Sequence, residues 1–75
     1  MKLADLNINE SCRILDFEIV DEKLKLRLEE LGLYRGNIIK ILKKSPLKKT
    51  LLIQIFNSCF AIKTAIASEI LIEKI

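Results

Sequence analysis

Two acidic pairs are the residues whose types and spacing come nearest to a metal site. Asp21-Glu22 and Glu29-Glu30 each place two carboxylates side by side in the chain, and hard cations such as Mg²⁺ and Ca²⁺ need several converging oxygen ligands. However, the first pair falls at the start of a predicted helix and the second on its surface, where solvated charge is the usual outcome. We therefore favour a structural interpretation, with metal ligation as the alternative, and the sequence leaves any metal ligands unknown.

The two cysteines, Cys12 and Cys59, are far apart in a chain that has no histidine. Neither belongs to a Cys-x-x-Cys metal or redox pattern, and a zinc site would lack ligands. We interpret each cysteine as a small buried hydrophobic residue. A thiolate metal site shared by the two, or a disulfide between them, is the alternative.

No catalytic group is recognisable in the sequence. Besides lacking histidine, the chain has no serine in a nucleophile-elbow setting and no glycine-rich phosphate-binding loop. Because none of the usual catalytic roles can be assigned, we predict a binding module without a cofactor and not an enzyme.

A cluster of lysines surrounds the segment Ser45-Pro46-Leu47. It has no acidic residue between its first and last lysine and contains Lys40, Lys43, Lys44, Lys48 and Lys49. A hairpin tip kept soluble by its charge is the simplest interpretation. Attraction to an acidic protein surface, a phospholipid headgroup or nucleic acid is the alternative, and a net charge of +3 is too small to decide among them.

The chain is hydrophobic for its size, since 51% of its 75 residues are apolar. A domain this small buries only about 60% of its unfolded surface. Surplus apolar side chains therefore predict a partner or a homo-oligomer, with an efficiently packed aliphatic core as the alternative. No apolar run approaches the roughly 20 residues of a membrane span, and the amino terminus lacks a signal-peptide pattern. We expect a single domain over residues 1–75, located in the cytoplasm.

The elements that position these residues begin with a helix whose end is strongly specified. Asp21 is a suitable N-cap, and leucines recur at helical spacing at Leu24, Leu28 and Leu31. Gly32 follows as a residue that reaches positive φ without a Cβ penalty, and Leu33 pairs with Leu28 as in a Schellman stop. Gly36 then marks a second turn before an apolar run.

Alternating apolar residues predict five strands around this helix. They are expected over residues 12–19, 37–44, 50–56, 59–63 and 70–75. A short helical turn over residues 64–69 precedes the last strand. Five short strands cannot form a deep two-sheet sandwich on so short a chain, but they can close into a small barrel that protects most of its edges.

Two details of this barrel are predicted at the level of single residues. The first strand is expected to point Leu15, Phe17 and Ile19 to one face. Asn57-Ser58 is expected to form a two-residue turn between the third and fourth strands, with Asn57 in the left-handed conformation.

Several short motifs occur in an order that is typical of one family. They are Arg27-Leu28, Leu31-Gly32-Leu33 and Gly36 in the helix and its stop, Lys44-Ser45-Pro46-Leu47 in the hairpin, and Ala61-Ile62-Lys63 and Ala67-Ser68-Glu69-Ile70 in the closing segment. With them the chain resembles the ferrous iron transport protein A family from Leu3 to Ile72. The resemblance implies a single FeoA-like domain, a mainly β five-stranded barrel of the SH3 type. A helix is inserted between its strands 1 and 2, and a short helical turn precedes its last strand.

The same resemblance implies a cytoplasmic accessory protein that regulates ferrous iron uptake. Its partner would be the cytosolic nucleotide-binding domain of the membrane ferrous iron transporter. The domain is also similar to the carboxy-terminal module of metal-dependent repressors, so weak transition metal binding is implied for the wider family. Whether transport is activated or inhibited, and whether nucleotide hydrolysis changes, is left open.

We expect the partner to bind a face formed by the helix end and the hairpin together. Tyr34 is the preferred anchor, because an aromatic side chain beside a turn offers a large contact area at low entropic cost. A partly buried lid on the barrel is the alternative role for Tyr34. The residues expected on the partner-binding face are Leu33, Tyr34, Arg35, Lys44, Ser45, Pro46, Leu47, Lys48 and Lys49.

The chain departs from the family pattern at three places. Arg35 stands where proline is common, Lys48-Lys49 where a Gly-Asp pair is common, and Asn57 or Ser58 where the turn often has glycine. Asparagine tolerates positive φ. The two lysines reverse the charge of the loop and argue against a partner contact that relies on an acidic tip.

Two other functions stay open. One is a metal-responsive regulatory module like the carboxy-terminal domain of iron-dependent repressors, which is expected to be joined to a helix-turn-helix domain. The other is a small RNA-binding barrel, which would need aromatic residues on a sheet face between basic residues. The four aromatics of this chain, Phe17, Tyr34, Phe56 and Phe60, are scattered, so nucleic acid is an unfavoured partner.

Overall fold

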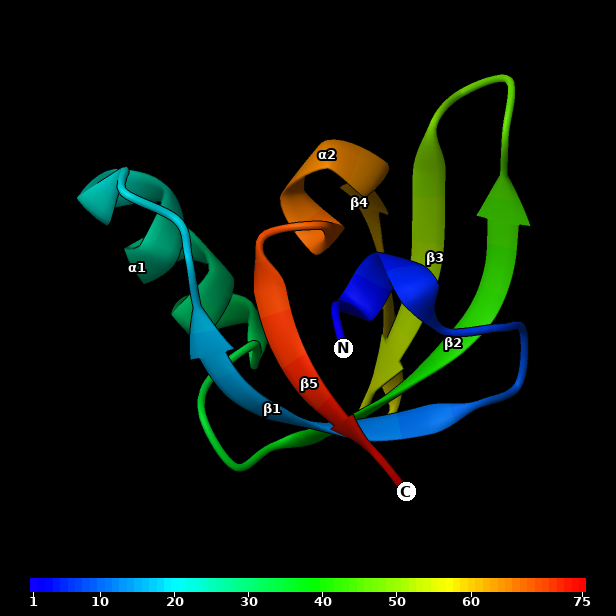
Figure 1. The fold of residues 1–75 in the computed structure, drawn as a ribbon, viewed down its shortest axis with the longest axis horizontal. Coiled ribbons are helices and arrows are strands. Elements are labelled where there is room, and N and C mark those ends of the chain that lie inside the picture. Colours follow the sequence, from blue (N-terminus) through cyan, green and yellow to red (C-terminus); the bar gives the residue numbers. More distant parts are fainter.

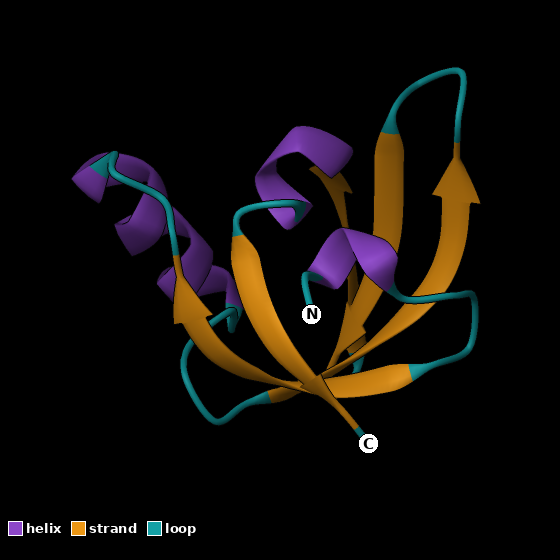
Figure 2. Ribbon diagram, viewed as in Figure 1, coloured by secondary structure: helices purple, strands orange, loops and turns teal.

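Five antiparallel strands form one curled sheet in the order β4-β3-β2-β1-β5 (Figure 1). The structure is a computed structural model that describes every residue from Met1 to Ile75. Its elements are η1 (Leu3–Asp5), β1 (Ser11–Phe17), α1 (Glu22–Leu31), β2 (Ile38–Ser45), β3 (Thr50–Ile55), β4 (Ser58–Lys63), α2 (Thr64–Ala67) and β5 (Ile70–Lys74). The predicted mainly β fold is confirmed: a helix lies between the first two strands and a short one precedes the last (Figure 2).

The barrel interior is filled by aliphatic side chains from every strand. The buried residues of β2 and β3 alternate along each strand, and β4 adds one more; they are Ile39, Ile41, Leu51, Ile53, Ile55 and Ile62. No polar or charged side chain is buried. Every polar and charged side chain therefore reaches the surface to some degree.

The amino-terminal segment packs into the barrel and covers the edge of β5. Leu3 and Leu6 are fully buried, and the Ile72 amide donates to the Met1 carbonyl at 2.9 Å. An isolated bridge joins Lys2 to Leu71 in β5. The sequence carries no signal for this contribution, because residues 1–10 show neither a helical nor an alternating pattern.

The prediction that Leu15, Phe17 and Ile19 share one face of the first strand is partly wrong. Cys12 and Ile14 are buried, whereas Leu15 is exposed. The pairing of β1 with β5 shifts its register between Ile14 and Asp16. Such a bulge inserts one extra residue and breaks the two-residue period. Phe17, beyond the bulge, therefore packs against the core as expected while Leu15 points outward.

The predicted helix stop is present in full. Gly32 has φ 108°, its amide donates to the Glu29 carbonyl at 3.0 Å, and the Leu33 amide donates to the Leu28 carbonyl at 2.9 Å. These two bonds are those of a Schellman motif. A β carbon on Gly32 would lie 2.7 Å from Cγ2 of Ile55, so the helix end sits against β3 at a distance that only glycine permits.

The turn between β3 and β4 lies one residue earlier than predicted. Ile55 pairs with Ser58, so the two loop residues are Phe56 and Asn57. Phe56 takes the left-handed conformation at φ 55°, and Asn57 is not among the residues of positive φ. The strand register explains the shift, because it matches the apolar residues of the two strands across the sheet, Leu51 with Ile62 and Ile53 with Phe60.

Candidate functional site

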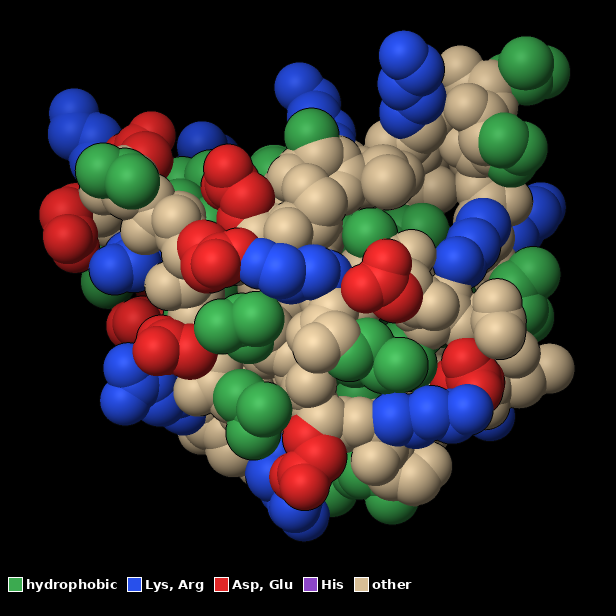
Figure 3. All heavy atoms as spheres, in the orientation of Figure 1, with side chains coloured by type: hydrophobic (Ala, Val, Ile, Leu, Met, Phe, Trp, Pro, Cys, Tyr) green, Lys and Arg blue, Asp and Glu red, His purple; other side chains and the backbone are tan.

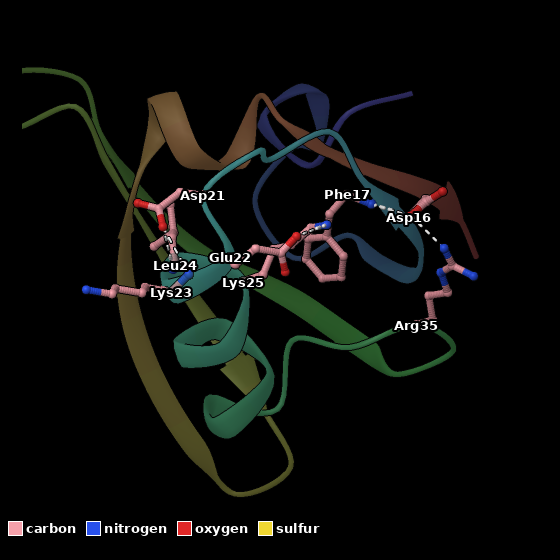
Figure 4. A network of polar contacts seen from close by, with 8 residues as sticks. All are labelled: Asp16, Phe17, Asp21, Glu22, Lys23, Leu24, Lys25 and Arg35. Carbon is pink, nitrogen blue, oxygen red and sulfur yellow. Dashed lines mark hydrogen bonds and ion pairs between the residues drawn. The ribbon is translucent and has the colours of Figure 1, made fainter.

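A surface cleft lies between the outer side of α1, the end of β1 and the loop that leads into β2. It has a volume of about 510 Å³. Apolar and charged side chains of both signs share its wall. We call it the Tyr34 cleft, and it is lined by Asp16, Phe17, Glu22, Lys25, Leu26, Glu29, Tyr34 and Arg35. Figure 4 shows polar contacts among residues of its wall, together with the Asp21 cap of α1.

Arg35 and Asp16 close one end of the Tyr34 cleft. Nη2 of Arg35 donates to Oδ1 of Asp16 at 3.0 Å, and the Phe17 amide donates to the same oxygen at 2.8 Å (Figure 4). The Phe17 amide, followed by the Arg35 guanidinium, holds the pKa of Asp16 below its ordinary value. The carboxylate is therefore charged at neutral pH and fixes the direction of the Arg35 side chain.

Hydrogen bonds fix the backbone of Tyr34 at both its amide and its carbonyl. Its amide donates to the Gly32 carbonyl at 3.2 Å, and its carbonyl accepts from the Asn37 amide at 3.1 Å. The second bond closes a turn in which Gly36 has φ 87° and Arg35 takes the second position, where proline is favoured. Tyr34 is 42% exposed. It is thus a partly exposed aromatic at the rim of a cleft, on a backbone that is already fixed.

Leu33 was expected on the same face, and this expectation is wrong. Its side chain is fully buried. The Schellman motif explains why, because the residue after the stop packs back against the helix at Leu28, which is also buried. Of the predicted helix-end residues, Tyr34 and Arg35 alone reach the surface.

The hairpin residues lie elsewhere. We call the hairpin tip, residues 45–50, together with Lys63 the lysine tip. It is joined to the Tyr34 loop by β2, whose eight residues span on the order of 26 Å at about 3.3 Å each. Figure 1 shows the tip of the β2–β3 hairpin projecting away from α1. The single partner-binding face that we expected is therefore two separate surfaces at opposite ends of β2.

Lys63 and Thr64 belong to the lysine tip region although they were not predicted there. Lys63 pairs with Thr50 across the β3–β4 ladder, and the Thr64 amide donates to the Lys49 carbonyl at 2.8 Å. The signal was in the sequence, because residues 31–68 hold seven basic residues and no acidic one. The rest of the chain holds six basic and all ten acidic residues.

The residues present do not fit a resident metal ion. No three side chains of histidine, cysteine, aspartate or glutamate come together. Asp21 caps α1 instead, with Oδ1 accepting from the Lys23 and Leu24 amides at 3.0 and 3.3 Å.

Cys12 is buried in β1, and Cys59 lies exposed on β4, against our interpretation that both are buried. Two strands separate β1 from β4 in the sheet, and both thiols are free.

None of the helices is both long and apolar enough to cross a membrane.

Solved structures share this fold over nearly the whole chain. The FeoA protein from Chlorobium tepidum is 23% identical with a TM-score of 0.90, and the match covers 99% of this chain and 70% of that one. FeoA from Stenotrophomonas maltophilia complexed with zinc, described as an SH3 domain protein, is 24% identical with a TM-score of 0.81 over 97% and 89% of the two chains. A manganese-dependent transcriptional repressor is 9% identical with a TM-score of 0.89 over 100% and 41%.

At these identities the solved structures show the fold alone, that of a small barrel of the SH3 type. No curated protein matches the chain. The FeoA domain family, which is associated with ferrous iron transport, matches residues 1–74. With this match over almost its entire length, the chain belongs to the FeoA domain family.

Proposed function

We propose that this protein is a cytoplasmic accessory protein of ferrous iron uptake. It binds the cytosolic nucleotide-binding domain of the membrane ferrous iron transporter and acts by that contact, without catalysing a reaction. The observation that carries the proposal is the FeoA domain match over residues 1–74.

The Tyr34 cleft is the surface we assign to this contact. An aromatic side chain whose backbone is already fixed loses little conformational entropy on binding, and such residues often dominate interface energies. Tyr34 meets this description, because hydrogen bonds hold its amide and its carbonyl. Carboxylates and the Arg35 guanidinium around it give the partner groups of both signs to pair with.

A titration tests the proposal and the assigned surface together. The full chain, labelled with ¹⁵N, is titrated with the cytosolic domain of its transporter, and shifts of the amide signals are mapped. The expected shifts concentrate in residues 14–17, 22–29 and 34–37 around the Tyr34 cleft. An absence of shifts at saturating concentration would contradict transporter binding, and shifts confined to another surface would contradict the assigned site.

The metal-responsive alternative is supported only by fold likeness to the repressor. A second titration with ferrous or zinc ion separates it from the first proposal. A specific site produces a localised response that saturates at a fixed ratio of metal to protein. We expect weak and scattered changes, because the chain offers no group of three ligands.

A further inference from the structure

The outermost point of the lysine tip is an apolar residue. Leu47 is 99% exposed at the end of a hairpin that projects from the barrel (Figure 1). The turn that presents it is closed by the Lys49 amide, which donates to the Pro46 carbonyl at 3.3 Å. Its position on a projecting tip means that Leu47 reaches a flat surface before the body of the domain does.

The lysines beside Leu47 have no counterions within the protein. Lys48, Lys49 and Lys63 are exposed, and none takes part in an ion pair. All ten carboxylates lie outside residues 31–68. Figure 3 shows the result on one face: the upper right, where the hairpin projects, carries green and blue side chains and no red ones. The protein therefore has a basic end with an apolar tip.

A hollow with a mostly apolar wall lies at the base of the tip, among residues that carry hydrogen-bond donors. It has a volume of about 590 Å³, and its wall includes the three lysines together with the hydroxyl-bearing Thr50 and Thr64. Ammonium and hydroxyl groups are among the side-chain donors that bind phosphate oxygens. The base of the tip thus brings three ammonium groups and two hydroxyl groups close to Leu47, where they can meet the phosphates of a surface that Leu47 touches.

We propose that the lysine tip binds the surface of an anionic phospholipid bilayer, with Leu47 entering the headgroup region. Clustered lysines gain from the negative potential of such a surface, and an apolar side chain gains from leaving water. The convex shape favours a bilayer over an acidic protein, because a protein would have to bring a pocket for Leu47. The proposal does not rest on transporter binding, since the Tyr34 cleft lies at the other end of β2.

Vesicle binding by the full chain tests the proposal. Vesicles of equal parts phosphatidylglycerol and phosphatidylcholine should bind the protein at low salt, whereas pure phosphatidylcholine vesicles should not. Replacing Lys48 and Lys49 by Gln should weaken binding about 30-fold, and Leu47→Ser should weaken it about tenfold. High salt should release the protein, because it screens surface charges. Equal binding to both vesicle types, or to neither, would overturn the proposal.

A fluorescent reporter tests the depth of Leu47. The chain contains no tryptophan, so Leu47→Trp gives a single emission signal, which should shift to the blue on the anionic vesicles. Val20→Trp is the matched control, because Val20 is 90% exposed but stands beside Glu18, Asp21 and Glu22. Its emission should not change. A shift at both positions, or at neither, would contradict insertion by the tip. A different result is that the transporter's cytosolic domain shifts the amide signals of the hairpin in a protein that does not bind vesicles. That result would overturn the proposal and assign the tip to an acidic protein surface.

Discussion

Gly32 at the end of α1 lies directly against Ile55 at the end of β3. A β carbon on the glycine would approach Cγ2 of Ile55 to 2.7 Å, and the amide of Asn37 donates from its side chain to the Gly32 carbonyl at 2.5 Å. The helix end is thereby fixed to the barrel on one side and to the following loop on the other. This arrangement determines where Tyr34 stands, only two residues later.

The two glycines of this segment should differ in their sensitivity to substitution. Gly32→Ala adds a methyl group in a left-handed conformation and against Ile55, so we expect a loss of about 2–4 kcal/mol in the free energy of unfolding. Gly36→Ala has the same backbone penalty at φ 87°, but nothing lies within 4 Å of its β carbon, so about 1 kcal/mol is expected. Urea unfolding measures both, and equal losses would contradict the close contact with Ile55.

The carboxylate of Asp16 should make stability depend on pH in the acidic range. Folding lowers the pKa of Asp16 from its ordinary value of 3.8. The stabilisation of the folded state by the charged carboxylate is therefore fully present above pH 3.8, and it is lost as the pH falls through the lower pKa of the folded protein. Asp16→Asn should remove this part of the acid sensitivity.

Arg35→Gln should raise the pKa of Asp16 only partway, since the Phe17 amide is the larger cause and stays in place. Carboxyl chemical shifts followed against pH measure this change. An unchanged pKa in the Arg35 variant would show that the ion pair is absent in solution.

The two thiols should react at very different rates. Cys59 is exposed, whereas Cys12 is buried and burial raises the pKa of its thiol to about 11. With a thiol reagent such as DTNB, we expect one fast reaction in the native protein, which Cys59→Ser removes. Cys12 should react only through unfolding, because the thiolate is the reactive form. Two fast reactions in the native protein would contradict the position of Cys12 in the core.

The five strands and the two helices after residue 10 are predictable because local residues specify them. The capping carboxylate of Asp21, the stop at Gly32 and the alternation of Ile39 with Ile41 depend on contacts within a few residues. The exposure of Leu15 depends instead on a bulge between two strands that are distant in the chain. The burial of Leu3 and Leu6 likewise depends on where the barrel leaves room.

The candidate sites were less predictable for the same reason. Leu33 and Tyr34 are adjacent and both apolar in character, yet one is fully buried and the other 42% exposed. Which of them faces outward follows from the Schellman geometry at the helix end. That the hairpin and the helix end do not share a face follows from the length and direction of β2, which no local motif encodes.

Binding of the transporter's cytosolic domain is the central claim, and isothermal titration with three forms of the full chain measures it most directly. The wild type should bind, and Tyr34→Ala should bind about 30-fold more weakly, as expected for an aromatic that dominates an interface. Leu47→Ala, the matched control at the other end of β2, should bind within about twofold of wild type. No binding by the wild type, or an unchanged affinity in Tyr34→Ala, would contradict the claim.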